Sequence, residues 1–179
     1  ADAGMLLIGI VSSSGELAAG PDSSWTLIDS GTLTSSSGSR HIAVYSKIAE
    51  ETGTQTFSVT VPAGSSSSAQ ATIVSIPGAV SATVIDKDNA VVFTDNTAEI
   101  NTTPDEHRMY IVFTNRAENG VQLPSPTPYG LNHPWVRNYD LNNVIYQYHS
   151  TASATALTGV SAVAQNVSGL FDIWTLKFT

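Results

Sequence analysis

The sequence contains no cysteine and few charged residues, and each deficit narrows what the chain can do. Without cysteine in its 179 residues, the chain can form neither disulfides nor thiolate metal sites. Lys and Arg number only 7 against 15 Asp and Glu, so the formal net charge is −8. Because so few cations can contact phosphate groups, we expect no binding to nucleic acid and none to an anionic membrane.

Long hydrophobic runs are also missing. No apolar stretch approaches the roughly 20 residues that cross a bilayer as a helix. The run from Met5 to Val11 is short and lacks a basic segment before it, so it does not have the form of a signal peptide. We therefore expect a protein that is made in a cytoplasm and is not exported by the standard route.

Small hydroxylated residues take the place of the missing charges. The chain has 23 Ser and 20 Thr, which compete with the helical backbone for hydrogen bonds and favour strands and loops. The hydrophobic fraction of 41% is sufficient for one core. We therefore predict a single all-β domain over residues 1–179.

Short β-rich segments follow one another along the chain, separated by turn residues. The segment Thr56–Val61 alternates polar and apolar residues strictly, which predicts a strand with one buried face. Asp86-Lys87-Asp88-Asn89 is read as a hairpin turn, because Asp and Asn favour turns. A calcium loop is the alternative reading, although the glycine and glutamate expected of such a loop are missing. The other predicted strands are Leu6–Val11, Trp25–Ile28, His41–Lys47, Ala71–Ile76 and Ala90–Thr94.

The second half of the sequence echoes the first at an offset near one hundred residues. Four features keep their order in the half-repeats 4–78 and 108–178: an apolar run, a Gly/Pro loop, a tryptophan, and a tyrosine-containing strand. Two similar four-strand halves predict about eight strands in a two-sheet, jelly-roll-like β-sandwich, because each half must cover one apolar sheet face.

The first half also resembles a known protein group. The run Gly4–Val11, a Gly/Pro loop, Ser24–Ile28 and then Ile42–Lys47 are similar to a pattern in phage tail, head-fibre and capsid decoration proteins. The match continues through Thr56-Phe57-Ser58 to Ile76-Pro77-Gly78. The resemblance implies a structural or adhesive role with no catalytic residues. The second half departs from it at Asn132-His133-Pro134-Trp135.

Catalytic signatures are not apparent in the sequence. The four histidines (His41, His107, His133 and His149) are scattered and form no metal-binding pair. No nucleophile elbow, Walker A loop or dinucleotide fingerprint is present. We therefore expect no enzyme activity, no catalytic or metal-binding residues and no cofactor.

Aromatic and amide residues gather between positions 124 and 143. Tyr129, Asn132, Trp135 and Tyr139 form a candidate ligand or partner loop, because sugar rings stack on aromatic faces while amides bond their hydroxyl groups. The alternative is that these rings pack in the core or at an interface, as we expect Trp25 to pack in the first half.

These observations predict a virion structural protein, either a capsid decoration (cement) protein or a head fibre, at the capsid surface. Its expected partner is the major capsid protein or another virion protein, and it would assemble as a homo-oligomer, with a trimer favoured. Ala1, Asp2 and Ala3 form a candidate shell-contacting arm. The alternative function is a tail or fibre adhesin, or a carbohydrate-binding module for host surface glycans.

Overall fold

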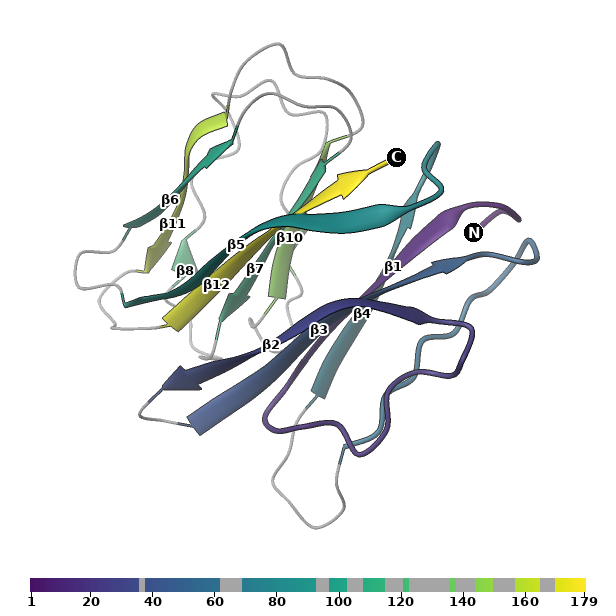
Figure 1. Ribbon diagram of the computed structural model, residues 1–179, viewed down its shortest axis with the longest axis horizontal. Coiled ribbons are helices and arrows are strands. Elements are labelled where there is room, and N and C mark those ends of the chain that lie inside the picture. Colours follow the sequence, from purple (N-terminus) through teal and green to yellow (C-terminus); the bar gives the residue numbers. More distant parts are fainter. Residues whose placement is uncertain are drawn as a thin grey trace. The chain divides into compact units, whose positions relative to one another are not determined.

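The described part of the chain is all-β and its strands form antiparallel sheets (Figure 1). The computed structural model describes residues 1–35, 38–61, 69–92, 97–102, 108–114, 121–122, 136–137, 144–149, 157–164 and 170–179. Within these ranges no residue is helical, and no helix could cross a membrane. The chain divides into two compact units, Ala1–Val84 with Phe178–Thr179, and Ile85–Lys177.

The first unit contains a four-stranded sheet with the order β2-β3-β1-β4 (Figure 1). β1 lies between β3 and β4, and each strand of this sheet is antiparallel to the strands beside it. β2 and β4 are therefore the two edge strands. The bounds are β1 (Leu6–Ser13), β2 (Thr26–Ser35), β3 (Gly38–Ile48) and β4 (Ala69–Ile76).

All eight residues of β1 are buried, which explains its continuous apolar run. Leu6, Ile8 and Ile10 lie on one face of the sheet, and Leu7 and Val11 lie on the other, because successive side chains of a strand alternate. A strand buried on only one face would instead show polar residues at every second position.

The remaining strands form two sheets. A five-stranded sheet has the order β5-β12-β7-β10-β9, and a three-stranded sheet has the order β6-β11-β8. The bounds are β5 (Ala82–Val92), β6 (Thr97–Thr102), β7 (Arg108–Thr114), β8 (Val121–Gln122), β9 (Val136–Arg137), β10 (Val144–His149), β11 (Leu157–Ala164) and β12 (Leu170–Phe178).

Strands β7 and β12 provide the core of the second unit. Met109, Ile111 and Phe113 alternate along β7 and are fully buried. Trp174 pairs with Ile111 in the ladder, and its ring meets that of Phe113 edge to face at a centroid distance of 5.1 Å. The regular alternation puts these apolar side chains on one face of the sheet.

The strand order of the first sheet recurs in the five-stranded sheet. In the first, β1 lies between β3 and β4, with β2 beyond β3; in the second, β7 lies between β10 and β12, with β9 beyond β10. The five-stranded sheet differs by having β5 beyond β12.

Three details differ from the sequence predictions. The described residues form twelve strands, not about eight, and two of them are only two residues long. Asp86–Asn89 is not a turn, because β5 continues through it from Ala82 to Val92. Its hydrogen bonding beside β12 outweighs local turn preference, and the Lys87 ammonium lies 4.2 Å from the centre of the Trp174 ring.

The third difference concerns Thr56–Val61, which belongs to no sheet among the described strands. Its exposure alternates as predicted, with Phe57, Val59 and Val61 half-buried and their neighbours exposed. Its only bridge in the described structure joins Thr60 to Ala19. The alternation arises because the segment packs one side against the sheet face, and packing of this kind needs no backbone ladder.

Candidate functional site

Aromatic side chains cover one face of the four-stranded sheet near its centre. Phe57 lies over Gly9, and its ring meets Trp25 at a centroid distance of 4.7 Å and Tyr45 at 5.7 Å. The Trp25 indole N–H donates to the carbonyl of Thr56 at 3.2 Å. Glycine at position 9 leaves the space that Phe57 fills, so this part of the sheet is closed to a ligand.

The residues before β1 are fixed against the segment after β3. The backbone nitrogens of Ala1 and Gly53 each donate to the other residue's carbonyl, at 3.0 and 2.9 Å. Ala3 donates to the Thr52 hydroxyl at 3.1 Å, and Gly4 donates to the Ala49 carbonyl at 2.7 Å. Gly4 has a φ of 81°, a left-handed conformation that glycine adopts without strain. These hydrogen bonds fix Ala1–Gly4 as an exposed segment, which we call the wall.

A groove of about 690 Å³ opens beside this wall. Its apolar lining comes from Met5, Leu7 and Ile73, and no aromatic ring is among its described lining residues. Leu7 is fully buried, whereas Met5 and Ile73 are half-buried. The rest of the lining comes from Ala1, Asp2, Thr52, Gly53, Thr54, Gln55 and Ser75.

Strand pairing explains why these groups meet. Leu7 of β1 is directly opposite Ser75 of β4, and Gly9 is opposite Ile73. Directly opposed residues project to the same face, so Leu7, Ile73 and Ser75 share the face that Phe57 partly covers. The groove therefore occupies the portion of this face that Phe57 leaves uncovered, next to the edge strand β4.

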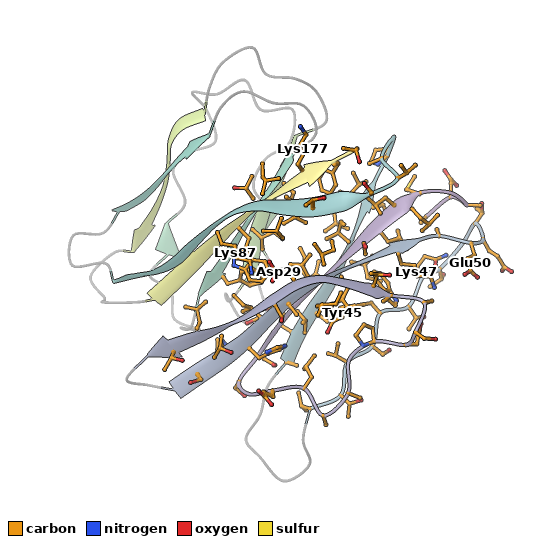
Figure 2. The ribbon with its side chains drawn as sticks, viewed as in Figure 1. Asp29, Tyr45, Lys47, Glu50, Lys87 and Lys177 are labelled. Atoms are coloured by element: carbon orange, nitrogen blue, oxygen red, sulfur yellow. The ribbon has the colours of Figure 1, made fainter. Side chains whose placement is uncertain are left out.

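The surroundings of the groove are acidic. Asp2 lies in its lining, and Glu50 and Glu51 precede the lining residue Thr52; all three are exposed. Lys47 is the basic residue closest in sequence to Glu50 and Glu51. Its ammonium points toward the Trp25 ring, 6.0 Å from the ring centre. Figure 2 labels Lys47 and Glu50, which lie toward the same end of β3. The carboxylates of Asp2, Glu50 and Glu51 outnumber the cation in the described lining, the N-terminal ammonium of Ala1, so these surroundings favour cations over anions.

Three groups in the first unit have shifted pKa values. The exposed Asp22 carboxylate accepts hydrogen bonds from the Ser24 hydroxyl and from the Ser24 backbone N–H, and these bonds lower its pKa. The charge of Lys47 lowers this pKa further, by a smaller amount. Burial raises the pKa of the Tyr45 phenol. Burial also lowers the pKa of Arg40, because the charged guanidinium loses hydration. None of these groups lines the groove.

A row of buried polar side chains lies on the opposite face of the sheet. Ser12 is directly opposite Gln70, and both are buried together with Arg40. Among the described residues, the Ser12 hydroxyl, both amide atoms of Gln70 and the Arg40 Nε have no hydrogen-bond partner. This row affects stability, because an unpaired buried polar group keeps its desolvation penalty.

The sequence-predicted site residues fall in two places. Ala1, Asp2 and Ala3 form the wall described above, and Ala1 and Asp2 line the groove. Tyr129, Asn132, Trp135 and Tyr139 lie outside the described residues, so the candidate ligand loop remains a prediction. His41 is half-buried within β3, and His149 ends β10 as expected.

The groove itself was not predicted from the sequence. Its members come from three separate segments (1–7, 52–55 and 73–75) and carry no motif. Only the consecutive Thr52-Gly53-Thr54-Gln55 loop was a visible signal, and such loops are common. Among the described residues no three His, Cys, Asp or Glu side chains group as metal ligands would.

Comparison with known proteins returned no matching family model, no similar curated protein and no similar solved structure.

Proposed function

We propose that this chain is a structural protein of a phage particle that binds the assembled shell, as a capsid decoration protein or a head fibre. The observation that carries the binding role is the open groove, in which the half-buried Met5 and Ile73 lie beside an exposed and hydrogen-bonded wall. The assignment to a phage particle rests on the resemblance of residues 4–78. The proposed partner is the major capsid protein or another virion protein, and the proposed place is the capsid surface.

The proposal extends to the architecture: a single jelly-roll-like sandwich of two sheets built from two similar halves. Two observations support it. The strand order β2-β3-β1-β4 recurs as β9-β10-β7-β12. Apolar faces on β1 and on β7 and β12 are buried, as the facing surfaces of a sandwich must be.

We also propose a homo-oligomer, with a trimer favoured, that stabilises the shell by binding and has no catalytic step. Assembly with further subunits is one way to cover the edge strands of a sheet. β2 and β4 are the edges of the first sheet.

Light scattering and shell binding test the proposal together. The chain has a mass of 18.8 kDa, so light scattering from a trimer should give three times that value. The protein should also co-sediment with emptied phage shells and delay their thermal disruption. The variant Ser75→Arg, which places a long side chain at the groove, should weaken binding, whereas Thr32→Arg on the exposed part of β2 should not. A protein that sediments separately from shells contradicts the proposed function; a monomer that binds shells contradicts only the trimer.

Glycan recognition by a tail or fibre adhesin is the second candidate. The sequence cluster of Tyr129, Asn132, Trp135 and Tyr139 favours it. Replacing Trp135 and Tyr139 by Ala should abolish binding on a glycan array while the circular dichroism spectrum stays unchanged. Loss of the folded spectrum would show instead that these rings serve packing.

A further inference from the structure

We infer that the groove between residues 1–5, the loop 52–55 and β4 binds an extended peptide segment that carries aliphatic and basic side chains. The inference gives the partner chemistry for the proposed shell-binding function and rests on it for the biological setting. The chemical argument itself comes from the lining of the groove, its charge and the strand beside it.

The lining favours aliphatic side chains over sugars. Met5, Leu7 and Ile73 provide apolar, non-aromatic contacts, whereas a sugar ring needs an aromatic face on which to stack. The volume of about 690 Å³ lies within the roughly 300–1,000 Å³ range of ligand pockets. It is suited to a few residues of a partner and is too small for a folded element.

The charge of the surroundings favours basic residues. Asp2, Glu50 and Glu51 are all exposed, and their three carboxylates outnumber the one cationic group of the described lining, the N-terminal ammonium of Ala1. The net charge of −8 also attracts basic partners, at longer range. Complementary charge at the rim increases the association rate and selects between partners of similar shape, so acidic peptides and phosphorylated ligands are disfavoured.

The strand beside the groove favours an extended backbone. β4 is an edge strand, paired only with β1 among the described strands. Ile73 and Ser75, two positions apart, both line the groove, which matches the two-residue period of an extended peptide. Backbone groups on the outer side of an edge strand can bond such a peptide, while side-chain contacts provide the selectivity.

Fluorescence anisotropy of a labelled Lys-Val-Lys-Val-Lys-Val-Lys peptide tests the inference with the full-length chain. We expect it to bind at least tenfold more tightly than two control peptides, one with Glu in place of Lys and one with Ser in place of Val. Raising the salt concentration should weaken binding, because the rim charges are exposed.

Matched variants locate the site. Glu50→Lys should weaken binding of the lysine peptide severalfold, whereas Glu16→Lys, an identical charge change at another exposed loop position, should have a much smaller effect. Ser75→Arg should abolish binding. All three positions are exposed, so folding is expected to be retained.

Specific outcomes overturn the inference: no binding at millimolar peptide, equal binding of the lysine and glutamate peptides, equal binding of the valine and serine peptides, or equal effects of Glu50→Lys and Glu16→Lys. Peptide binding without shell binding contradicts the proposed function and leaves this inference standing. Shell binding without peptide binding contradicts the inference and leaves the proposed function standing.

Discussion

Two adjacent serines in β1 have opposite expected effects on stability. Ser12 and Ser13 are both fully buried. The Ser13 hydroxyl donates to the Gly15 carbonyl at 2.5 Å, whereas the Ser12 hydroxyl has no hydrogen-bond partner in the part of the chain that the structure describes. We predict that Ser13→Ala lowers the free energy of unfolding by about 0.5–1.5 kcal/mol, because it removes a buried hydrogen bond.

Ser12→Ala should instead raise the free energy of unfolding, by about 1 kcal/mol, because it removes an unpaired buried polar group. Urea denaturation of the two variants checks both signs, and each variant is the other's control. Equal losses in both would show that the Ser12 hydroxyl is hydrogen-bonded in solution, for example to water.

Gly9 is a second position at which a single methyl group should be costly. An added Cβ would lie 2.5 Å from Cε2 of Phe57 and 2.8 Å from Cδ2 and Cζ. Trp25 and Tyr45 restrict where that ring can move. We predict that Gly9→Ala lowers the free energy of unfolding by about 1–3 kcal/mol, the usual range for overpacking.

Gly15→Ala is the control for Gly9→Ala, since no atom lies within 4 Å of its added Cβ, and it should change stability much less. In a double-mutant cycle with Phe57→Ala, most of the Gly9→Ala penalty should disappear. A penalty that persists without the Phe57 ring would place its origin in the strand backbone.

At the scale of elements, the stability of the turn before β2 depends on the ionisation of Asp22 and therefore on pH. Asp22 accepts hydrogen bonds from the Ser24 hydroxyl and from its backbone N–H, the latter at 2.8 Å, and the Asp22 carbonyl accepts from the Trp25 backbone N–H at 3.1 Å. The pKa of Asp22 is below its ordinary value of 3.8. The ionised form therefore stabilises the turn above pH 3.8, and this contribution is lost as the pH falls through the folded-state pKa.

Removing the Ser24 hydroxyl should raise the pKa of Asp22 toward its ordinary value, because that bond is the largest cause of the shift. Carboxyl-carbon NMR titration of the wild type and of Ser24→Ala measures the change. Ser23→Ala is the neighbouring control. An unchanged pKa in Ser24→Ala would assign the shift to the backbone bond and to Lys47.

The sequence predicted which segments are strands better than it predicted how they are joined. The apolar run of β1 and the rich β-propensity of β3 were sufficient to place both strands. Thr56–Val61 shows the limit, because alternating exposure reports one buried side and does not distinguish a sheet ladder from a segment packed across a sheet face. Asp86–Asn89 shows another limit: turn preference is local, whereas the β5 backbone is bonded to β12, which follows in the sequence only after residue 169.

The candidate site was less predictable for a similar reason. Ala1, Asp2 and Ala3 were expected to contact a partner, but the sequence did not indicate that Gly53 would bond to the Ala1 backbone. Hydrogen bonds between backbone groups about fifty residues apart leave no residue-type signature. The register of β1 and β4, which brings Ser75 opposite Leu7, is likewise a property of the folded sheet.

At the scale of the whole molecule, the boundary between the two compact units falls inside strands. It separates Val84 from Ile85 within β5 and Lys177 from Phe178 within β12. The backbone of Thr179 also bonds to that of Val80 and Ser81, so the chain end belongs with the first unit. Unfolding one unit alone would have to break both strands at the boundary.

We therefore predict that residues 1–179 unfold as a single domain in one calorimetric transition. For 179 residues, an unfolding enthalpy of about 0.7 kcal/mol per residue near 60 °C gives about 125 kcal/mol. The van't Hoff enthalpy of a two-state monomer should equal this calorimetric value. Two resolved transitions, or a van't Hoff enthalpy near half the calorimetric one, would show that the halves unfold independently. In an oligomer the transition temperature rises with protein concentration, so scans at several concentrations separate domain cooperativity from subunit dissociation.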